Sequence, residues 1–188
     1  MLKLRLDSLE PNLGPDDGIR QQLAECSRLA AETIREVRTI SYALYPPMLE
    51  EAGLKSAIPW FLHGFMERSG VTTKLDIADD FPRQPREVEL AIFRVLQESL
   101  TNVIRHSGSR AANIRVSMQG EVVKLEIADQ GKGISPLVLE ALNRGSLGEL
   151  GIGLRGMRER IRQLGGALEV SSISGETIVR ASVPCGKT

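Results

Sequence analysis

The stretch "LQESLTNVIRHS", residues 96–107, places carboxyl, amide and imidazole groups in a segment whose apolar spacing predicts a helix from about Pro85 to His106. At about 100° per residue, one side of this helix is apolar and carries Phe93, Leu96, Leu100, Val103 and Ile104. The opposite side is polar and carries Arg94, Glu98, Asn102 and His106. A solvated face with i, i+4 ion pairs is one interpretation, but Asn102 and His106 are not residues that a helix interior favours. The polar side therefore has to be explained from the rest of the chain.

Composition excludes several classes of protein. The chain has 188 residues, of which 41% are hydrophobic, and this is typical of one soluble domain with a smaller appendage. Its 24 basic residues balance its 24 acidic ones, which argues against a general nucleic-acid binder. The longest apolar stretch is too short to span a bilayer, and Cys26 and Cys185 are too isolated for a disulfide framework or a zinc site. We expect a cytoplasmic segment without membrane contact, with any membrane anchor upstream.

Helices are predicted before the opening stretch. Residues 1–10 and about 18–44 have helical apolar spacing and are separated by "PNLGPDD", so they predict a helical hairpin. The narrow apolar stripe of the second arm suits packing between helices, although packing of this arm on the main domain is an alternative. Residues 50–70, "EEAGLKSAIPWFLHGFMERSG", predict a further helix.

Strands alternate with helices in the remaining chain. "VTTKLDIAD", residues 71–79, predicts one strand, and residues 113–129 predict two strands joined by a hairpin turn at Gln119 and Gly120. Residues 134–150 show weak periodicity, and we expect a mobile lid there. A helix over 154–164 and strands over 167–173 and 177–184 follow. This order predicts an α+β fold with a mixed sheet packed on helices, not a regular βαβ fold.

Two glycine-containing motifs follow the polar helix. In "LEIADQGKGI" a strand ends in Asp129, whose carboxylate can accept a hydrogen bond from an exocyclic amine, while Gly131 and Gly133 let the backbone approach a flat ring. Adenine fits such a site, although D-x-G-x-G is also a common turn. In "GELGIGLRGMRERI" Gly151 and Gly153 precede a helix whose first amides can hold phosphate oxygens.

Two other patterns are rejected. Gly151, Gly153 and Gly156 satisfy G-x-G-x-x-G, but the strand that a dinucleotide fold needs before them is missing. The final "CGKT" is similar to the end of a phosphate-binding loop, but Ala181 stands where its first glycine would be.

The order of the motifs is more specific than any one of them. A helix with Glu98 and Asn102, then D-x-G-x-G, then G-x-G-L resembles the ATP-binding domain of the GHKL superfamily, which histidine kinases, gyrase, mismatch-repair ATPases and large heat-shock chaperones share. "GLRGMRERIRQLGG" and "IREVRTISYALYPPMLEEAGLKSAI" are similar to bacterial sensor histidine kinases of the group related to NarX and DesK. The resemblance implies a two-layer α/β sandwich of the Bergerat type over residues 51–188. It also implies that residues 1–50 are part of a dimerisation and phosphotransfer hairpin.

The resemblance also implies roles for individual residues. Asn102 would bind Mg²⁺, and Glu98 would assist in-line attack on the γ-phosphate of ATP. The expected nucleotide-binding residues are Asn102, Arg105, His106, Asp129, Gly131, Gly133, Gly151, Gly153, Leu154 and Thr177. The polar side of the opening helix would then be the floor of a nucleotide pocket. Thr177 departs from the family pattern because Glu176, not glycine, precedes it.

The implied activity is that of a protein-histidine kinase that forms a homodimer through the hairpin and passes phosphate to a response regulator of the NarL/FixJ class. The acceptor pattern of such kinases, near E-x-x-R-I-A-R-E-L-H-D, does not occur here, so we expect Mg-ATP binding without self-phosphorylation. His63 has no carboxylate directly after it to act as a base, and a satisfied helix histidine is the expected interpretation. A nucleotide-gated binding module or an ATPase of the gyrase or chaperone type is the alternative.

Overall fold

The computed structural model describes residues 25, 26, 28, 29, 47–144 and 152–186. The chain divides into two compact units, residues 1–47 and 48–188. The hairpin expected within residues 1–50 lies almost entirely outside the described residues. The helices and strands from Pro47 onward are, in chain order, α3 (Pro47–Ser69), β1 (Thr72–Ile77), α4 (Arg86–Asn102), the π-helical turn η2 (Val103–Ser107), β2 (Ala111–Gln119), β3 (Val122–Gln130), α5 (Pro136–Arg144), α6 (Ile152–Gln163), β4 (Ala167–Ile173) and β5 (Glu176–Pro184).

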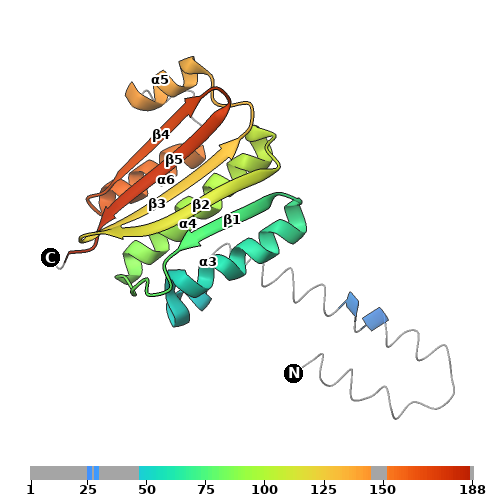
Figure 1. Cartoon of the computed structure of the whole chain (residues 1–188), viewed down its shortest axis with the longest axis vertical. Helices are drawn as coiled ribbons and strands as arrows, with labels where there is room; N and C mark the ends of the chain where they lie inside the picture. Colours follow the sequence, from blue (N-terminus) through green and yellow to red (C-terminus); the bar gives the residue numbers. More distant parts are fainter. Residues whose placement is uncertain (1–24, 27, 30–46, 145–151, 187–188) are drawn as a thin grey trace, which may run out of the picture. The chain divides into compact units, whose positions relative to one another are not determined.

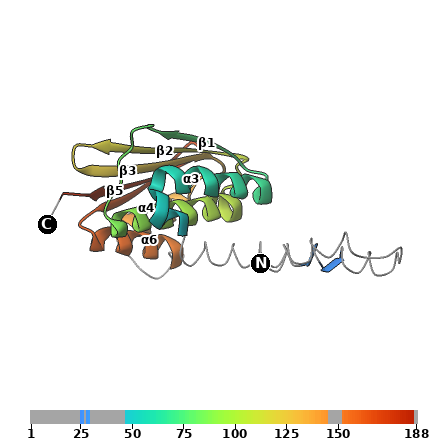
Figure 2. The same ribbon diagram turned by 90° about the horizontal axis from the view of Figure 1, so that it is seen from below.

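The strands form one five-stranded mixed sheet with the order β1-β2-β3-β5-β4 (Figure 1). β1 is parallel to β2, and the other neighbouring strands are antiparallel. Helices α3, α4 and α6 lie on one side of this sheet, as the view from below shows (Figure 2). The predicted α+β class and two-layer arrangement are therefore confirmed.

The core lies between the sheet and the helices because the strands alternate in burial. In β3, Val123, Leu125 and Ile127 are buried, whereas Lys124 between them is exposed. The apolar side of α4 meets this face, and Leu96 has an exposed fraction of 0%. Each such side chain contributes roughly 1.5–3 kcal/mol on burial, so this contact holds α4 across the sheet.

The end of the opening helix differs from the prediction. The helix expected from Pro85 to His106 ends as an α-helix at Asn102 and continues as η2. Val103 is buried as predicted, but Ile104 is 51% exposed, so its assignment to the apolar side was wrong. A π turn closes i→i+5 hydrogen bonds and holds more residues than an α turn, so the later residues rotate away from their places on an α-helical wheel.

The segment 134–150 is also more regular than expected, because Pro136–Arg144 form α5. The backbone N–H of Val138 donates to Ser135 Oγ at 3.4 Å, and the N–H of Leu139 donates to the Ser135 carbonyl at 3.0 Å. Ser135 is thus an N-cap with Pro136 at the first helical position, a pair of signals that the weak periodicity concealed. Residues 145–151 lie outside the described residues, so the mobile lid stays a prediction.

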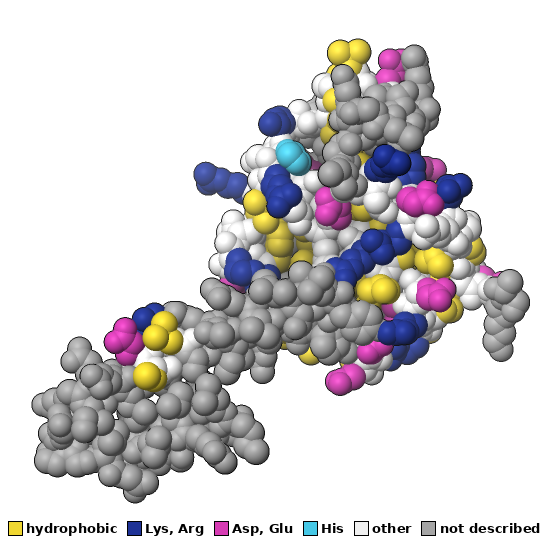
Figure 3. Space-filling view, turned by 180° about the vertical axis from the view of Figure 1, so that it is seen from behind, with side chains coloured by type: hydrophobic (Ala, Val, Ile, Leu, Met, Phe, Trp, Pro, Cys, Tyr) yellow, Lys and Arg dark blue, Asp and Glu magenta, His cyan; other side chains and the backbone are white. Residues whose placement is uncertain are grey.

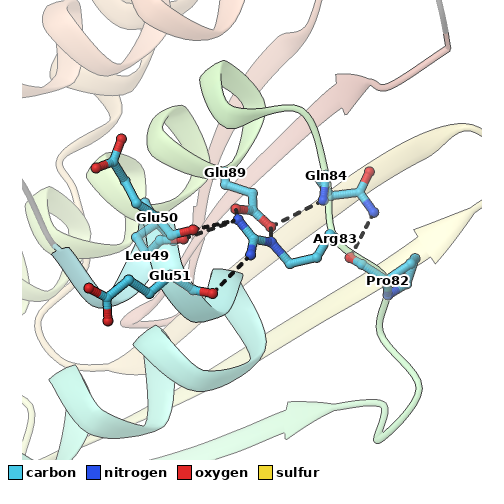
Figure 4. Close-up of polar contacts among 7 residues, drawn as sticks. All are labelled: Leu49, Glu50, Glu51, Pro82, Arg83, Gln84 and Glu89. Carbon is cyan, nitrogen blue, oxygen red and sulfur yellow. Dashed lines mark hydrogen bonds and ion pairs between the residues drawn. The ribbon is translucent and has the colours of Figure 1, made fainter.

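Helix α3 is broken at Gly53, whose backbone angles are φ 70° and ψ −175°. The break leaves carbonyl groups without helical partners, and the Arg83 guanidinium donates to three of them, on Leu49, Glu50 and Glu51, at 3.0–3.4 Å (Figure 4). Arg83 also binds both carboxylate oxygens of Glu89 at 3.1 Å. Glu89 is 2% exposed and also accepts from the N–H of Gln84. This cluster ties the first turn of α3 to the start of α4.

Within the described residues no helix is both long and apolar enough to cross a membrane.

Candidate nucleotide-binding site

A row of polar side chains crosses the helix-facing side of the sheet at one end of its core. Asp129 follows Val123, Leu125 and Ile127 at intervals of two residues, so its carboxyl group lies on the same face as they do. The register pairs Asp129 with Thr177 on β5, and Thr177 with Ser172 on β4. Directly paired residues of antiparallel strands have Cβ atoms about 4.5–5.5 Å apart. The sheet thus brings together Asp129 and Thr177, two residues that the sequence selected separately.

Asp129 is a buried carboxyl group with two hydrogen-bond donors. Its exposed fraction is 6%; Ser107 Oγ donates to Asp129 Oδ1, and the backbone N–H of Gly131 also donates to the carboxyl group. Burial raises the pKa of Asp129 above its usual value, and the bonds from Ser107 and Gly131 oppose that rise. The carboxylate has about four acceptor positions, so it can still accept a donor from a ligand.

Gly131 is needed for space. A Cβ atom at this position would lie 2.0 Å from Ser107 Oγ and 2.3 Å from the Ser107 carbonyl oxygen. The space in the side-chain direction of Gly131 is therefore occupied by Ser107, and the approach of its backbone to a ligand ring stays a prediction.

Gly133 is needed for both conformation and space. Its φ is 74°, and a Cβ atom there would lie 2.7 Å from Ser172 Oγ. The N–H of Ile134, the next residue, donates to the same Ser172 oxygen at 2.9 Å. The loop after β3 is thus attached to β4 through Ser172.

Glu98 and Gly153 meet between α4 and α6. A Cβ atom at Gly153 would lie 1.8 Å from Glu98 Oε1, so a larger residue there would displace the carboxylate from the first turn of α6. Amide groups at a helix N-terminus favour negative charge, which suits either Glu98 or a phosphate. The polar side of α4 therefore faces the start of α6, as a site shared by both motifs requires.

The remaining expected residues lie around these contacts. Asn102 is half-buried at the end of α4, whereas Arg105 and His106 are exposed on η2. Leu154 is half-buried and packs against the core. Gly151 lies outside the described residues.

Positive charge accumulates where α4 and α6 adjoin. The pKa of Arg94 is lowered, first by burial and then by the nearby charge of Arg160. Figure 3 shows the helix-covered face, where Lys and Arg side chains stand among acidic and apolar ones. Arg160 lies in the last turn of α6, so these two guanidinium groups concentrate positive charge between α4 and the end of that helix.

Comparison with known families decides the class of this site. Residues 87–187 match the family described as histidine kinase-, DNA gyrase B- and HSP90-like ATPase. The chain belongs to this ATPase family. The matched segment includes the polar side of α4, the loop after β3 and the start of α6, and family membership implies the use of ATP.

Sensor histidine kinases are among the similar proteins. The chain is 30% identical to sensor histidine kinase MctS of Rhizobium johnstonii over 80% of this chain and 32% of MctS. It is 31% identical to sensor histidine kinase NarS of Mycobacterium tuberculosis over 96% of this chain and 39% of NarS. It is 29% identical to sensor histidine kinase LiaS of Bacillus subtilis over 90% of this chain and 44% of LiaS. The chain thus spans about a third to under a half of the length of these relatives.

Solved structures confirm the fold of the ATPase domain. The histidine kinase domain of the blue-light activated histidine kinase from Erythrobacter litoralis EL346 has a TM-score of 0.62 at 20% identity, covering 98% of this chain and 92% of that one. Histidine kinase AdeS of Acinetobacter baumannii has a TM-score of 0.57 at 18% identity, covering 99% and 94%. The family match confirms the prediction of an ATP-binding domain, and these structures confirm its fold.

Sequence reasoning missed Ser107 and Ser172 in this ATPase domain. Ser107 follows His106 directly and was concealed by the π turn, which an α-helical wheel does not represent. Ser172 could have been found by counting, because it follows Leu168 and Val170 on the inward face of β4 just as Asp129 follows Ile127 on β3. A polar residue that continues an inward-facing apolar row is the signal in both strands.

The interpretation of His63 also needs correction. Glu67, one helical turn later, places its Oε1 3.5 Å from His63 Nε2, and the His63 side chain is 74% exposed. The histidine does have a neighbouring carboxylate, because residues four apart meet on a helix. The absence of a carboxylate directly after it was therefore the wrong criterion.

Magnesium fits this site only as a partner of the nucleotide. The described residues contain no cluster of three or more His, Cys, Asp or Glu side chains that could hold a metal ion. Mg²⁺ usually keeps several waters and binds proteins through one or two oxygen ligands together with substrate phosphates. The single amide oxygen of Asn102 suits that mode of binding.

Proposed function

We propose that this chain is the Mg-ATP-binding catalytic part of a sensor histidine kinase of the group related to NarX and DesK. The observation that carries the proposal is the buried Asp129 carboxylate beside Thr177, at the end of a core strand and next to the glycine loop of a member of this ATPase family. A carboxylate that is buried yet retains acceptor positions fits an exocyclic amine such as that of adenine.

The adenine end of the site consists of Asp129, Gly131, Gly133 and Thr177. Asp129 accepts from the adenine amine, and Thr177 stands beside it on the same face of the sheet. Gly131 and Gly133 shape the loop through their contacts with Ser107 and Ser172. The base is thus bound by groups that the sheet holds in place.

The phosphate end lies between α4 and α6. Glu98 would assist in-line attack on the γ-phosphate, and Asn102 would be the protein ligand of Mg²⁺. The other expected phosphate contacts are Arg105, His106, Gly151, Gly153 and Leu154. When bound, Mg²⁺ neutralises charge on the phosphates. Phosphoryl transfer asks mainly for positioning and charge stabilisation, so these residues act by orientation and electrostatics.

The phosphoryl group goes to a histidine other than the two in these 188 residues. His106 is on the turn that directly follows the proposed metal ligand, so it cannot readily reach the in-line position opposite the leaving oxygen. His63 lies in the same compact unit as the site, on α3, and is not carried toward it by movement between the two units. Residues 1–50 form part of a hairpin that dimerises, and a response regulator of the NarL/FixJ class receives the phosphate.

The test is nucleotide binding by Asp129→Asn, measured by calorimetry in excess Mg²⁺. Losing the charged acceptor should weaken ATP binding by at least about ten-fold and the binding of inosine triphosphate much less. Unchanged ATP affinity would remove Asp129 from the adenine site.

Asn102→Ala provides the companion measurement at the other end of the site. Its ATP affinity should be nearly the same with Mg²⁺ and with a chelator, whereas wild type should bind more tightly with Mg²⁺. Steady ATP hydrolysis by the wild-type chain alone would favour an ATPase of the gyrase or chaperone type.

A further inference from the structure

Ser107 has a hydrogen-bond arrangement with only one possible direction. Its Oγ accepts the backbone N–H of Ser109 at 3.0 Å and also contacts Asp129 Oδ1. An ionised carboxylate only accepts, so the Ser107 hydroxyl must donate its single proton to Asp129. The carboxylate thus sets the direction of the bond, and the N–H of Ser109 helps to hold the hydroxyl oxygen in place.

Ser107 is also fixed in position. Its side chain is buried, and its backbone carbonyl accepts the N–H of Lys132 at 2.9 Å. Gly131 packs against both its Oγ and its carbonyl oxygen, where no Cβ atom would fit. The end of η2 and the loop after β3 therefore hold Ser107 from two sides.

The consequence concerns the remaining acceptor positions of Asp129. Ser107 and the N–H of Gly131 occupy part of the carboxylate, and both are donors. A ring that presents an amine can bind the positions that remain, whereas a ring that presents a carbonyl oxygen would place acceptor against acceptor. A site with fixed polar groups rejects the analogue that cannot pair with them.

We propose that Ser107 is a positioning residue that sets base specificity, because its hydroxyl keeps Asp129 an oriented acceptor that takes 6-aminopurine nucleotides and rejects 6-oxopurine nucleotides. The proposal rests on the proposed function, since it deepens the role of Asp129 in reading adenine. Ser107 acts through Asp129 and does not itself contact the base.

The first experiment compares ATP with inosine triphosphate, which carries oxygen in place of the adenine amine, by calorimetry on the whole chain. Ser107→Ala should weaken ATP binding by roughly ten-fold and the binding of inosine triphosphate by less than about two-fold, so the preference for ATP falls about five- to ten-fold. Ser109→Ala is the matched control. It removes a hydroxyl that donates to the Ala111 carbonyl, yet keeps the backbone N–H that binds Ser107, and its preference should equal that of wild type.

A double-mutant cycle separates positioning from general damage. If Ser107 acts only through Asp129, Ser107→Ala should not change the preference between the two nucleotides in an Asp129→Asn background. An equal loss of both nucleotides in Ser107→Ala, or an unchanged preference, overturns the proposal. The proposal is also overturned if Ser107→Ala lowers the preference for ATP as much in the Asp129→Asn background as in wild type.

A second readout needs no nucleotide. The Ser107 bond lowers the pKa of Asp129, so Ser107→Ala should raise the pKa measured from the carboxyl carbon resonance of Asp129 in the free protein, while Ser109→Ala leaves it in place. A pKa that does not move overturns the inference. If wild type binds both nucleotides equally, the adenine role of Asp129 fails, and this titration still decides whether Ser107 controls the carboxylate.

Discussion

Asp129 shows at the scale of a single residue how a functional group is kept in an apolar setting. It takes the place of a core residue at the end of the Ile127 row, and burial disfavours its charged form. Ser107 and the N–H of Gly131 compensate in part by donating hydrogen bonds to it. A buried carboxyl group that is compensated only in part generally lowers stability, as is common for polar groups at binding sites.

The raised pKa of Asp129 predicts how its removal changes the pH dependence of stability. Between the unfolded value, about 3.9, and the raised folded value, the folded state holds more protons than the unfolded state, so wild-type stability falls as pH rises. Asp129→Asn lacks this titration. The free energy of unfolding of the variant minus that of wild type should therefore increase with pH through this window and then level off. Urea unfolding at several pH values measures it, and a flat or decreasing difference would contradict the assigned pKa shift.

Gly131→Ala should destabilise the protein by about 1–3 kcal/mol, because the new methyl group would overlap Ser107 at both its Oγ and its carbonyl oxygen. It should also weaken ATP binding by displacing the Ser107 hydroxyl from Asp129. Gly156→Ala is the matched control, since nothing lies within 4 Å of its Cβ position in α6. That variant should gain up to about 1 kcal/mol from improved helix propensity. Equal effects of the two substitutions in urea unfolding would show that close packing at Gly131 is unimportant.

At the scale of elements, the change from α4 to η2 decides which residues face the site. A continuous α-helix would have kept Ile104 on the apolar side. The π turn instead buries Val103 and Ser107 and exposes Ile104, Arg105 and His106. π turns inside helices are frequent at functional sites. Here the turn delivers the Ser107 hydroxyl to Asp129.

The cluster around Arg83 is the second feature at this scale, and Arg83→Ala should destabilise the protein by about 3 kcal/mol or more. The substitution would leave the buried Glu89 carboxylate without its cation and would also free the carbonyls at the break in α3 (Figure 4). Arg115→Ala is the control because it breaks an ion pair with Asp76 whose side chains are 64% and 65% exposed, and it should cost less than about 1 kcal/mol. If urea unfolding shows similar losses of unfolding free energy for the two variants, burial of the Glu89 carboxylate is not the cause of the loss.

At the scale of the whole molecule, the buried core of the described residues runs from Leu49 to Val183 and lies entirely in the second compact unit. A chain that begins at Met48 should therefore keep the unfolding temperature, and its ATP affinity should stay within about two-fold. A chain that begins at Lys55 is the control, because it lacks Leu49, Leu54 and the carbonyls that Arg83 binds. It should unfold at a lower temperature. Loss of cooperative unfolding in the chain from Met48 would show that the first unit is required for this fold.

The sequence by itself determined the α+β class, the positions of the strands and the family resemblance, because these depend on local periodicity and on motif spacing along the chain. Alternation of two predicts β3 and its inward face, and spacing of three and four predicts the buried side of α4. Asp129 and the two glycines after it were identifiable for the same reason, since they follow one strand directly.

Tertiary structure decided how these pieces meet. Asp129 and Thr177 are 48 positions apart in the chain, and only the register between β3 and β5 makes them neighbours. Glu98 meets Gly153 only because α4 and α6 pack side by side, and Ser107 reaches Asp129 only through the π turn. Strand register and helix packing arise from burial of the whole core, which no local pattern encodes. Most residues of the candidate site could thus be predicted from the sequence, whereas the packing of the sheet and helices decided what each of them contacts.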